Sequence, residues 1–225
     1  MYARWPCPTP DGGTADEMAL VFGARRNARL MVIPPLFDEA NRFRHQIIEI
    51  AYCLDERGID SICPDLPGCN ESLAPHSAQT LSGWRKAAAA AARHFAATHV
   101  LAIRSGCWLA PDSLPGWLYA PAKSGQILRA MLRARTLAAR EAGREETAEA
   151  LLEIGRKQGL GLAGWDLGAG LIAELETSEF EPHERHTVVE QADVGGKPLW
   201  LRAENDSDPA QAEALAALIA LGIVR

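Results

Sequence analysis

The sequence predicts an α/β fold, in which a mostly parallel central sheet carries helices on both of its faces. Short apolar runs typical of buried strands alternate with longer segments whose apolar residues have helical spacing. Proline or glycine follows most of these runs and marks a turn. The length of 225 residues suits a single domain, residues 1–225, whose core is large enough to need no disulfides.

The first half of the chain supplies most of the expected sheet. We expect strands at residues 19–22, 29–33, 59–63 and 98–103. A helix with Gly58 just past its end is predicted by an apolar stripe of Phe43, Ile47, Ile50 and Leu54. Thr80 is the expected N-cap of a second helix, whose buried stripe is Trp84, Ala88, Ala91 and Phe95. This alternation predicts parallel strands joined by helices.

The second half is more helical. A strand is expected at residues 116–121, and two helices between residues 126 and 159, broken near Gly143. With a further helix near residues 171–175, this block predicts a helical cap inserted at about residues 123–177. Residues 187–190 and 198–202 are expected to complete the sheet. The final helix should begin at Asp208, with Pro209 and Gln211 in its first turn.

Composition limits the classes of function that the protein can have. The net charge of −6 argues against nucleic-acid binding and against a polybasic membrane anchor. No apolar run approaches the roughly 20 residues of a membrane span, and the N-terminal residues lack the pattern of a signal peptide. The five cysteines are irregularly spaced and include no C-x-x-C, so we expect reduced thiols and a cytoplasmic protein.

The most informative segment follows the strand at residues 98–103. Residues 102–106 have the layout of a nucleophile elbow, G-x-S-x-G, with small residues at both ends. Arg104 stands at the apex, where the nucleophilic serine belongs, and a guanidinium cannot attack a carbonyl. Ser105 lies one position too late, and Cys107 is the other substitute nucleophile to consider. No catalytic residue is therefore assigned.

The other members of a Ser-His-Asp triad are also missing. Glu190 or Asp193 could be the acid, because either follows the expected seventh strand. No histidine occurs between residues 194 and 225, where the triad histidine should lie. His183 and His186 precede that strand and are expected in a solvated loop, with a metal site as the less favoured alternative.

Two further patterns have simpler explanations. Residues 159–164 match G-x-G-x-x-G, but they follow a helix and open no new one, which argues against dinucleotide binding. Four arginines fall along one face of the expected helix after residue 126, as on a solvated surface or a groove for an anionic partner. These are Arg129, Arg133, Arg140 and Arg144. No metal or cofactor is predicted.

Four stretches resemble one family. Residues 33–44 resemble P-P-F-x-E-E-x-N-x-x-R, and residues 63–72 resemble the P-D-L-x-G-x-G-x-S of many α/β-hydrolases. Residues 103–106 resemble a G-x-R-x-G elbow, and residues 119–125 with 132–135 resemble Q-P-V-x-x-G with a later L-R-x-R. Together they resemble hydrolase 2 of the exosortase-A-associated system, which lies beside bacterial exopolysaccharide and protein-sorting genes. The resemblance implies an α/β-hydrolase fold with arginine in place of serine.

Two classes of function remain open. One is a non-hydrolytic binding or accessory protein; the other is a hydrolase or acyl-transfer enzyme that acts on an ester or acylated sugar with unusual residues. The pocket should be formed by the strand ends that meet the elbow, at Pro35, Leu36, Phe37, Asp38, Glu39, Arg104 and Ser105. Arg104 needs a partner there. That partner is Glu39, with Asp38 second, or a small anionic ligand such as a carboxylate or phosphate.

Overall fold

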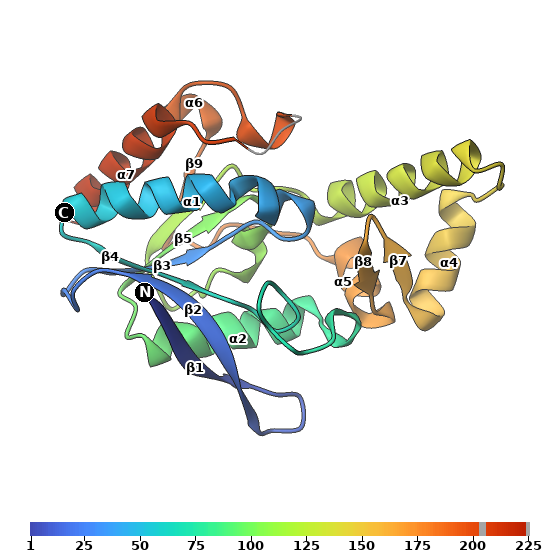
Figure 1. Cartoon of the computed structure of the whole chain (residues 1–225), viewed down its shortest axis with the longest axis horizontal. Helices are drawn as coiled ribbons and strands as arrows, with labels where there is room; N and C mark the ends of the chain where they lie inside the picture. The colour runs from blue at the N-terminus through green and yellow to red at the C-terminus, as the bar shows by residue number, and fades with distance from the viewer. Residues whose placement is uncertain (203–205, 224–225) are drawn as a thin grey trace.

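The computed structural model describes residues 1–202 and 206–223. A seven-stranded sheet forms its centre (Figure 1). In spatial order the strands are β1 (Tyr2–Pro8), β2 (Thr14–Phe22), β4 (Asp60–Pro64), β3 (Arg29–Ile33), β5 (His99–Ile103), β6 (Gly116–Tyr119) and β9 (His186–Val189). The strands β4, β3, β5, β6 and β9 are parallel. This is the mostly parallel sheet that the sequence predicts.

The antiparallel edge was missed. β1 was not expected, and the strand expected at residues 19–22 is only the end of the longer β2. Pro6 and Pro8 argue against a strand, yet β1 pairs with β2 alone, and an edge strand tolerates proline. Trp5 and Cys7 alternate with the prolines and point into the core. The burial of Trp5 and Cys7, on alternate positions of β1, therefore stabilises the strand more than the two missing proline N–H donors weaken it.

Helices cover both faces. α1 (Asp38–Glu56) and α7 (Pro209–Ile223) lie on one face, and α2 (Leu81–His94) lies on the other (Figure 1). The predicted stripe of α1 is buried along its whole length, from Phe43 to Leu54. Thr80 caps α2, because its hydroxyl accepts a hydrogen bond from the N–H of Gly83 at 2.9 Å. The hydroxyl of this cap removes one unpaired donor from the start of the helix.

The segment between β6 and β9 lies beyond the carboxyl ends of the parallel strands (Figure 1). We call residues 124–177 the insert. It comprises α3 (Ser124–Glu141), α4 (Ala148–Gln158), the hairpin of β7 (Leu160–Leu162) and β8 (Trp165–Leu167), and α5 (Ala169–Thr177). The G-x-G-x-x-G stretch falls in β7 and its turn. Trp165 of the hairpin donates a hydrogen bond to Asp38 at 3.1 Å, which ties the insert to the start of α1.

The strand expected at residues 198–202 is wrong. Leu199–Leu201 forms a short 3₁₀ helix, η3, and β9 is the last strand of the sheet. The ring of Trp200 stacks on Phe43 of α1 at 6.2 Å between centroids, so this apolar run packs over a helix and adds no strand. Asp208 accepts a hydrogen bond from the N–H of Gln211 at 3.2 Å and begins α7, as predicted. Among the described residues, no helix has the length and apolar character to cross a bilayer.

Candidate functional site at the turn after β5

The turn after β5 has the geometry of a strained elbow. Arg104 adopts a φ of 55°, a left-handed conformation that is uncommon for a residue with a side chain. Gly106 passes so close to the β3 end that a Cβ there would lie 2.3 Å from the carbonyl oxygen of Pro34. Only glycine fits this approach. A short 3₁₀ helix, η2 (Arg104–Leu109), follows the turn.

Each of the three guanidinium nitrogens of Arg104 donates a hydrogen bond. Its Nε and Nη2 donate to the two carboxylate oxygens of Glu39, at 3.0 and 3.2 Å. Nη1 donates to the carbonyl oxygen of Ala120 at 2.8 Å. The Cζ atom lies 4.1 Å from the ring centroid of Trp200, a cation–π contact. Both charged side chains are mostly buried, at 15% exposed for Arg104 and 21% for Glu39.

Trp200 is itself held in place over Arg104. Arg42 of α1 donates a hydrogen bond to the carbonyl oxygen of Trp200 at 3.1 Å. Tyr119, at the end of β6, packs edge-on against the indole at 6.1 Å, and its hydroxyl donates to Gln191 at 2.6 Å. Burial raises the pKa of Tyr119 to about 12. This role of Trp200 was not predictable from the sequence, because Trp200 lies in an apolar run that favours a strand.

Ser105 is turned away from the surface. Its side chain is 0% exposed, and its hydroxyl oxygen accepts a hydrogen bond from the N–H of Leu36 at 2.8 Å. In nucleophile-elbow enzymes an N–H of the loop after β3 helps to stabilise the oxyanion. Here Leu36 of that loop donates its N–H to Ser105. The hydroxyl of Ser105 is therefore buried and accepts a structural hydrogen bond, and the N–H of Leu36 already has a partner.

Cys107 is equally inaccessible. It is 1% exposed, and its thiol donates to the carbonyl oxygen of Ala102 at 3.2 Å. Burial is the main influence on its pKa and raises it well above the ordinary value for a thiol. A reactive cysteine needs the thiolate form, which this environment disfavours.

The loop from Pro35 to Glu39 fills the space beside the elbow. Pro35, Leu36 and Phe37 are buried. Phe37 contacts aromatic rings from the loop after β4, from α2 and from the insert; these belong to His76, Trp84 and Trp165. Asp38 accepts from Trp165 and takes no part in the ion pair of Arg104. Glu39, the first of the two expected partners, is the one that pairs with Arg104.

The remaining triad candidates serve other roles. Asp193 accepts from the N–H of Glu190 at 2.8 Å, and the two form a capping box for α6 (Gln191–Val194). His186 begins β9 beside Gly116, the first residue of β6, so it lies at the strand end opposite the elbow. The ring of His183 accepts from the N–H of Arg185. Across residues 1–202 and 206–223, no group of three or more metal-ligating side chains occurs.

Comparison with known proteins supports the fold. No family description matches the chain, and no curated protein matches its sequence. Esterase Est1E from Butyrivibrio proteoclasticus, solved with ferulic acid, matches with a TM-score of 0.50 and 15% identity over 73% of this chain and 68% of that one. Alpha/beta hydrolase domain-containing protein 10 from mouse matches with a TM-score of 0.50 and 16% identity over 72% of this chain and 65% of that one.

These similarities show the fold of the protein. With its mostly parallel sheet, flanking helices and strained turn after β5, the chain has the α/β-hydrolase fold. It spans only 60% of the length of a further structure, from Agrobacterium vitis S4, at a TM-score of 0.45. Identities this low concern the fold alone, and chemistry must be argued from the site.

Proposed function

We propose that the protein is a non-hydrolytic α/β-hydrolase-fold protein with a binding or accessory role, linked to bacterial exopolysaccharide and exosortase systems. The observation that carries the non-hydrolytic reading is the bidentate ion pair between Arg104 and Glu39 at the nucleophile position. A paired guanidinium cannot form an acyl-enzyme intermediate.

The surroundings of the elbow support the same proposal. The N–H of Leu36 already donates a hydrogen bond to the hydroxyl of Ser105. Trp200, which lies in η3 after the last strand, covers the guanidinium of Arg104. The triad histidine belongs after the last strand, and the sequence has none there. These observations support a site that has no serine nucleophile at the apex and no free N–H at Leu36, and residues 187–225 offer no histidine as base. The insert acts as a cap over this filled site.

Activity-based labelling tests the proposal. Purified protein should not release p-nitrophenol from short-chain esters above the buffer rate, and a fluorophosphonate probe should leave it unlabelled. A serine esterase of the same fold, treated in parallel, is the positive control. Stoichiometric labelling at Ser105 would instead establish the alternative, an enzyme that acts on esters or acylated sugars.

The link to exopolysaccharide systems rests on the resemblance of residues 33–44 and 119–125 to the exosortase-associated family. Deleting the gene in its own host should lower exopolysaccharide secretion, and re-expression of the wild-type chain should restore it. Normal secretion in the deletion strain would separate the protein from that system and leave its non-hydrolytic character untouched.

A further inference from the structure

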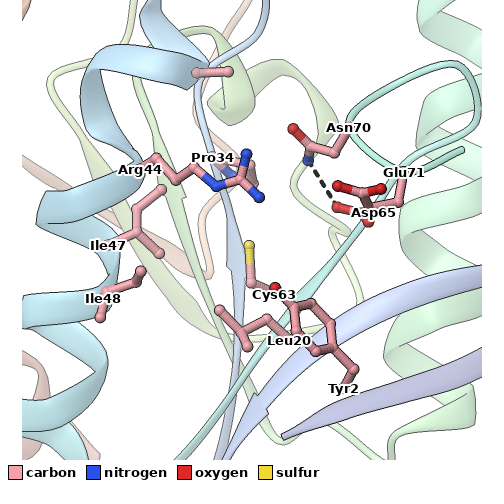
Figure 2. Close-up of a pocket in the computed structure, with 11 residues that line it drawn as sticks. Tyr2, Leu20, Pro34, Arg44, Ile47, Ile48, Cys63, Asp65, Asn70 and Glu71 are labelled. Carbon is pink, nitrogen blue, oxygen red and sulfur yellow. Dashed lines mark hydrogen bonds between the residues drawn. The ribbon is translucent and has the colours of Figure 1, made fainter. Parts of the chain in front are cut away.

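A second concave site lies apart from the elbow, beside the carboxyl end of β4. Figure 2 shows it between α1, the strands β2 and β4, and the loop that follows β4. Its cavity has a volume of about 90 Å³. That space is several times what one water molecule needs, so it can take the polar head of a small organic molecule. No residue of the Arg104 ion pair lines it.

The two walls carry opposite charges. Arg44 reaches in from α1, and Asp65 and Glu71 face it from the loop after β4 (Figure 2). Among the residues that the structure describes, no ion pair joins Arg44 to either carboxylate. The pocket therefore holds one cation and two anions apart from each other, with space between them.

The environment of Asp65 is consistent with an unfilled partner position. Burial is the largest influence on its carboxyl and raises its pKa above the ordinary value. The amide of Asn70, which donates to Asp65 at 2.7 Å, the N–H of Glu71 and the charge of Arg44 oppose that shift only in part. A cation in the cavity would favour the charged carboxylate.

The floor of the pocket is apolar. Leu20 of β2 and Ile47 of α1 line this floor, the thiol of Cys63 of β4 points up between them, and the ring of Tyr2 closes one side (Figure 2). Such a surface accepts an aliphatic group and gains from removing it from water. The site thus combines a cation, a pair of anions and a short apolar platform.

We infer that this pocket binds a small zwitterion, an α-amino acid with a short aliphatic side chain. The carboxylate of the ligand pairs with Arg44, its ammonium lies between Asp65 and Glu71, and its side chain rests on Leu20 and Ile47. A simple anion meets two carboxylates here, and a divalent cation meets only two carboxylates and an opposing arginine. A zwitterion matches both walls. This inference is independent of the proposed function.

Calorimetric titration with three matched compounds tests the inference. L-valine has both charges, isobutylamine is valine without its carboxylate, and isovalerate is valine without its ammonium. Valine should bind tightest, and each analogue should bind at least about tenfold more weakly, because each loses one charge-assisted pair. Equal binding of valine and isobutylamine, or no heat with millimolar valine, would overturn the inference.

Two variants locate the binding. Arg44 and Glu71 are exposed, so Arg44→Met and Glu71→Gln should fold normally. Each should weaken valine binding about tenfold, and Arg44→Met should also abolish the preference for valine over isobutylamine. Arg129→Met, at an exposed arginine of α3, is the matched control and should bind valine like the wild type. Wild-type affinity in Arg44→Met would place valine elsewhere and contradict the inference.

Discussion

Arg104 has a strained backbone and an unusually complete set of partners. A non-glycine residue held in an uncommon φ/ψ region costs roughly 1–3 kcal/mol. Against that cost stand two hydrogen bonds to Glu39, one to the carbonyl oxygen of Ala120, and the contact with Trp200. Charge-assisted bonds are about twice as strong as neutral ones. The side chain therefore stabilises the turn that its backbone strains.

Replacing Arg104 by methionine should destabilise the protein. The variant keeps the bulk of the side chain but leaves Glu39 mostly buried without its cation, so we expect a loss of about 3 kcal/mol in unfolding free energy. Urea denaturation measures this loss. The double variant Arg104→Met with Glu39→Gln should recover part of it, since no charge is then stranded. Unchanged stability with lost binding of acetate or phosphate would assign Arg104 to an anionic ligand instead.

Restoring the serine should not restore catalysis. In Arg104→Ser the hydroxyl has no histidine to take its proton, because none follows β9 in the sequence. We expect no fluorophosphonate labelling and no esterase activity above the wild-type background. The matched control is Arg129→Ser, which introduces the same residue at an exposed position of α3, away from the apex. Labelling at position 104 would mean that another base reaches the elbow.

At the scale of elements, the short 3₁₀ helix η3 positions Trp200 against both Arg104 and Phe43. The run at residues 198–202 contains three consecutive apolar residues, Leu199, Trp200 and Leu201, and such a short apolar run predicts a buried strand from the sequence alone. The structure instead uses Trp200 to cover Arg104 and Phe43. Arg42 fixes the segment through the carbonyl oxygen of Trp200. Removing this hydrogen bond should loosen the packing of Trp200 over Arg104 without changing the turn at residues 102–106.

We therefore expect Arg42→Met to lower unfolding free energy by about 1–2 kcal/mol, since a charged donor to a carbonyl is lost. Acrylamide quenching of tryptophan fluorescence should rise as Trp200 becomes accessible. Arg44→Met changes the same residue type two positions along α1 and should leave quenching unchanged. Equal effects in both variants would show that the helix, and not the hydrogen bond, controls the segment.

The sequence predicted these elements unevenly. Strong periodic signals, such as the α1 stripe ending at Leu54 and the caps Thr80 and Asp208, were correct because they depend on neighbours in the chain. β1 and η3 were missed because tertiary partners decide them: an edge position for the prolines and a helix surface for Trp200. At the site, the elbow and the choice of Glu39 were predictable from strand ends. The hydrogen bond from the N–H of Leu36 to the hydroxyl of Ser105 was not predictable, since it depends on the side-chain rotamer of Ser105.

At the scale of the whole molecule, buried carboxyls couple the hairpin β1–β2 to the loop after β4. Glu17 of β2 is 3% exposed and accepts a hydrogen bond from the hydroxyl of Ser72 at 2.7 Å. Burial is the largest influence on Glu17 and raises its pKa. A carboxyl whose pKa is raised on folding contributes stability below its unfolded pKa of about 4.3, and that contribution is lost as pH rises through the folded value.

Glu17→Gln should remove this dependence on pH. Glutamine keeps an acceptor for Ser72 and cannot ionise. The variant should gain stability relative to the wild type as pH rises from about 4 towards neutrality. Thermal unfolding of both proteins across that range gives the comparison, with Glu181→Gln in an exposed loop as control. A constant difference between variant and wild type would show that Glu17 titrates alike in both states.

Gly106 has an evolutionary consequence. A side chain at Gly106 would collide with the carbonyl oxygen of Pro34, so the close approach of this turn to the end of β3 requires glycine at position 106 whatever residue stands at the apex. A lineage could exchange a nucleophile for an arginine in one step and still inherit an intact scaffold. The reverse change, from arginine back to a working nucleophile, needs more than one substitution. Under the proposed function, it requires a serine at the apex, a histidine after β9 and a released N–H at Leu36 together. Under the proposed function, hydrolytic chemistry on this scaffold is therefore easier to lose than to regain.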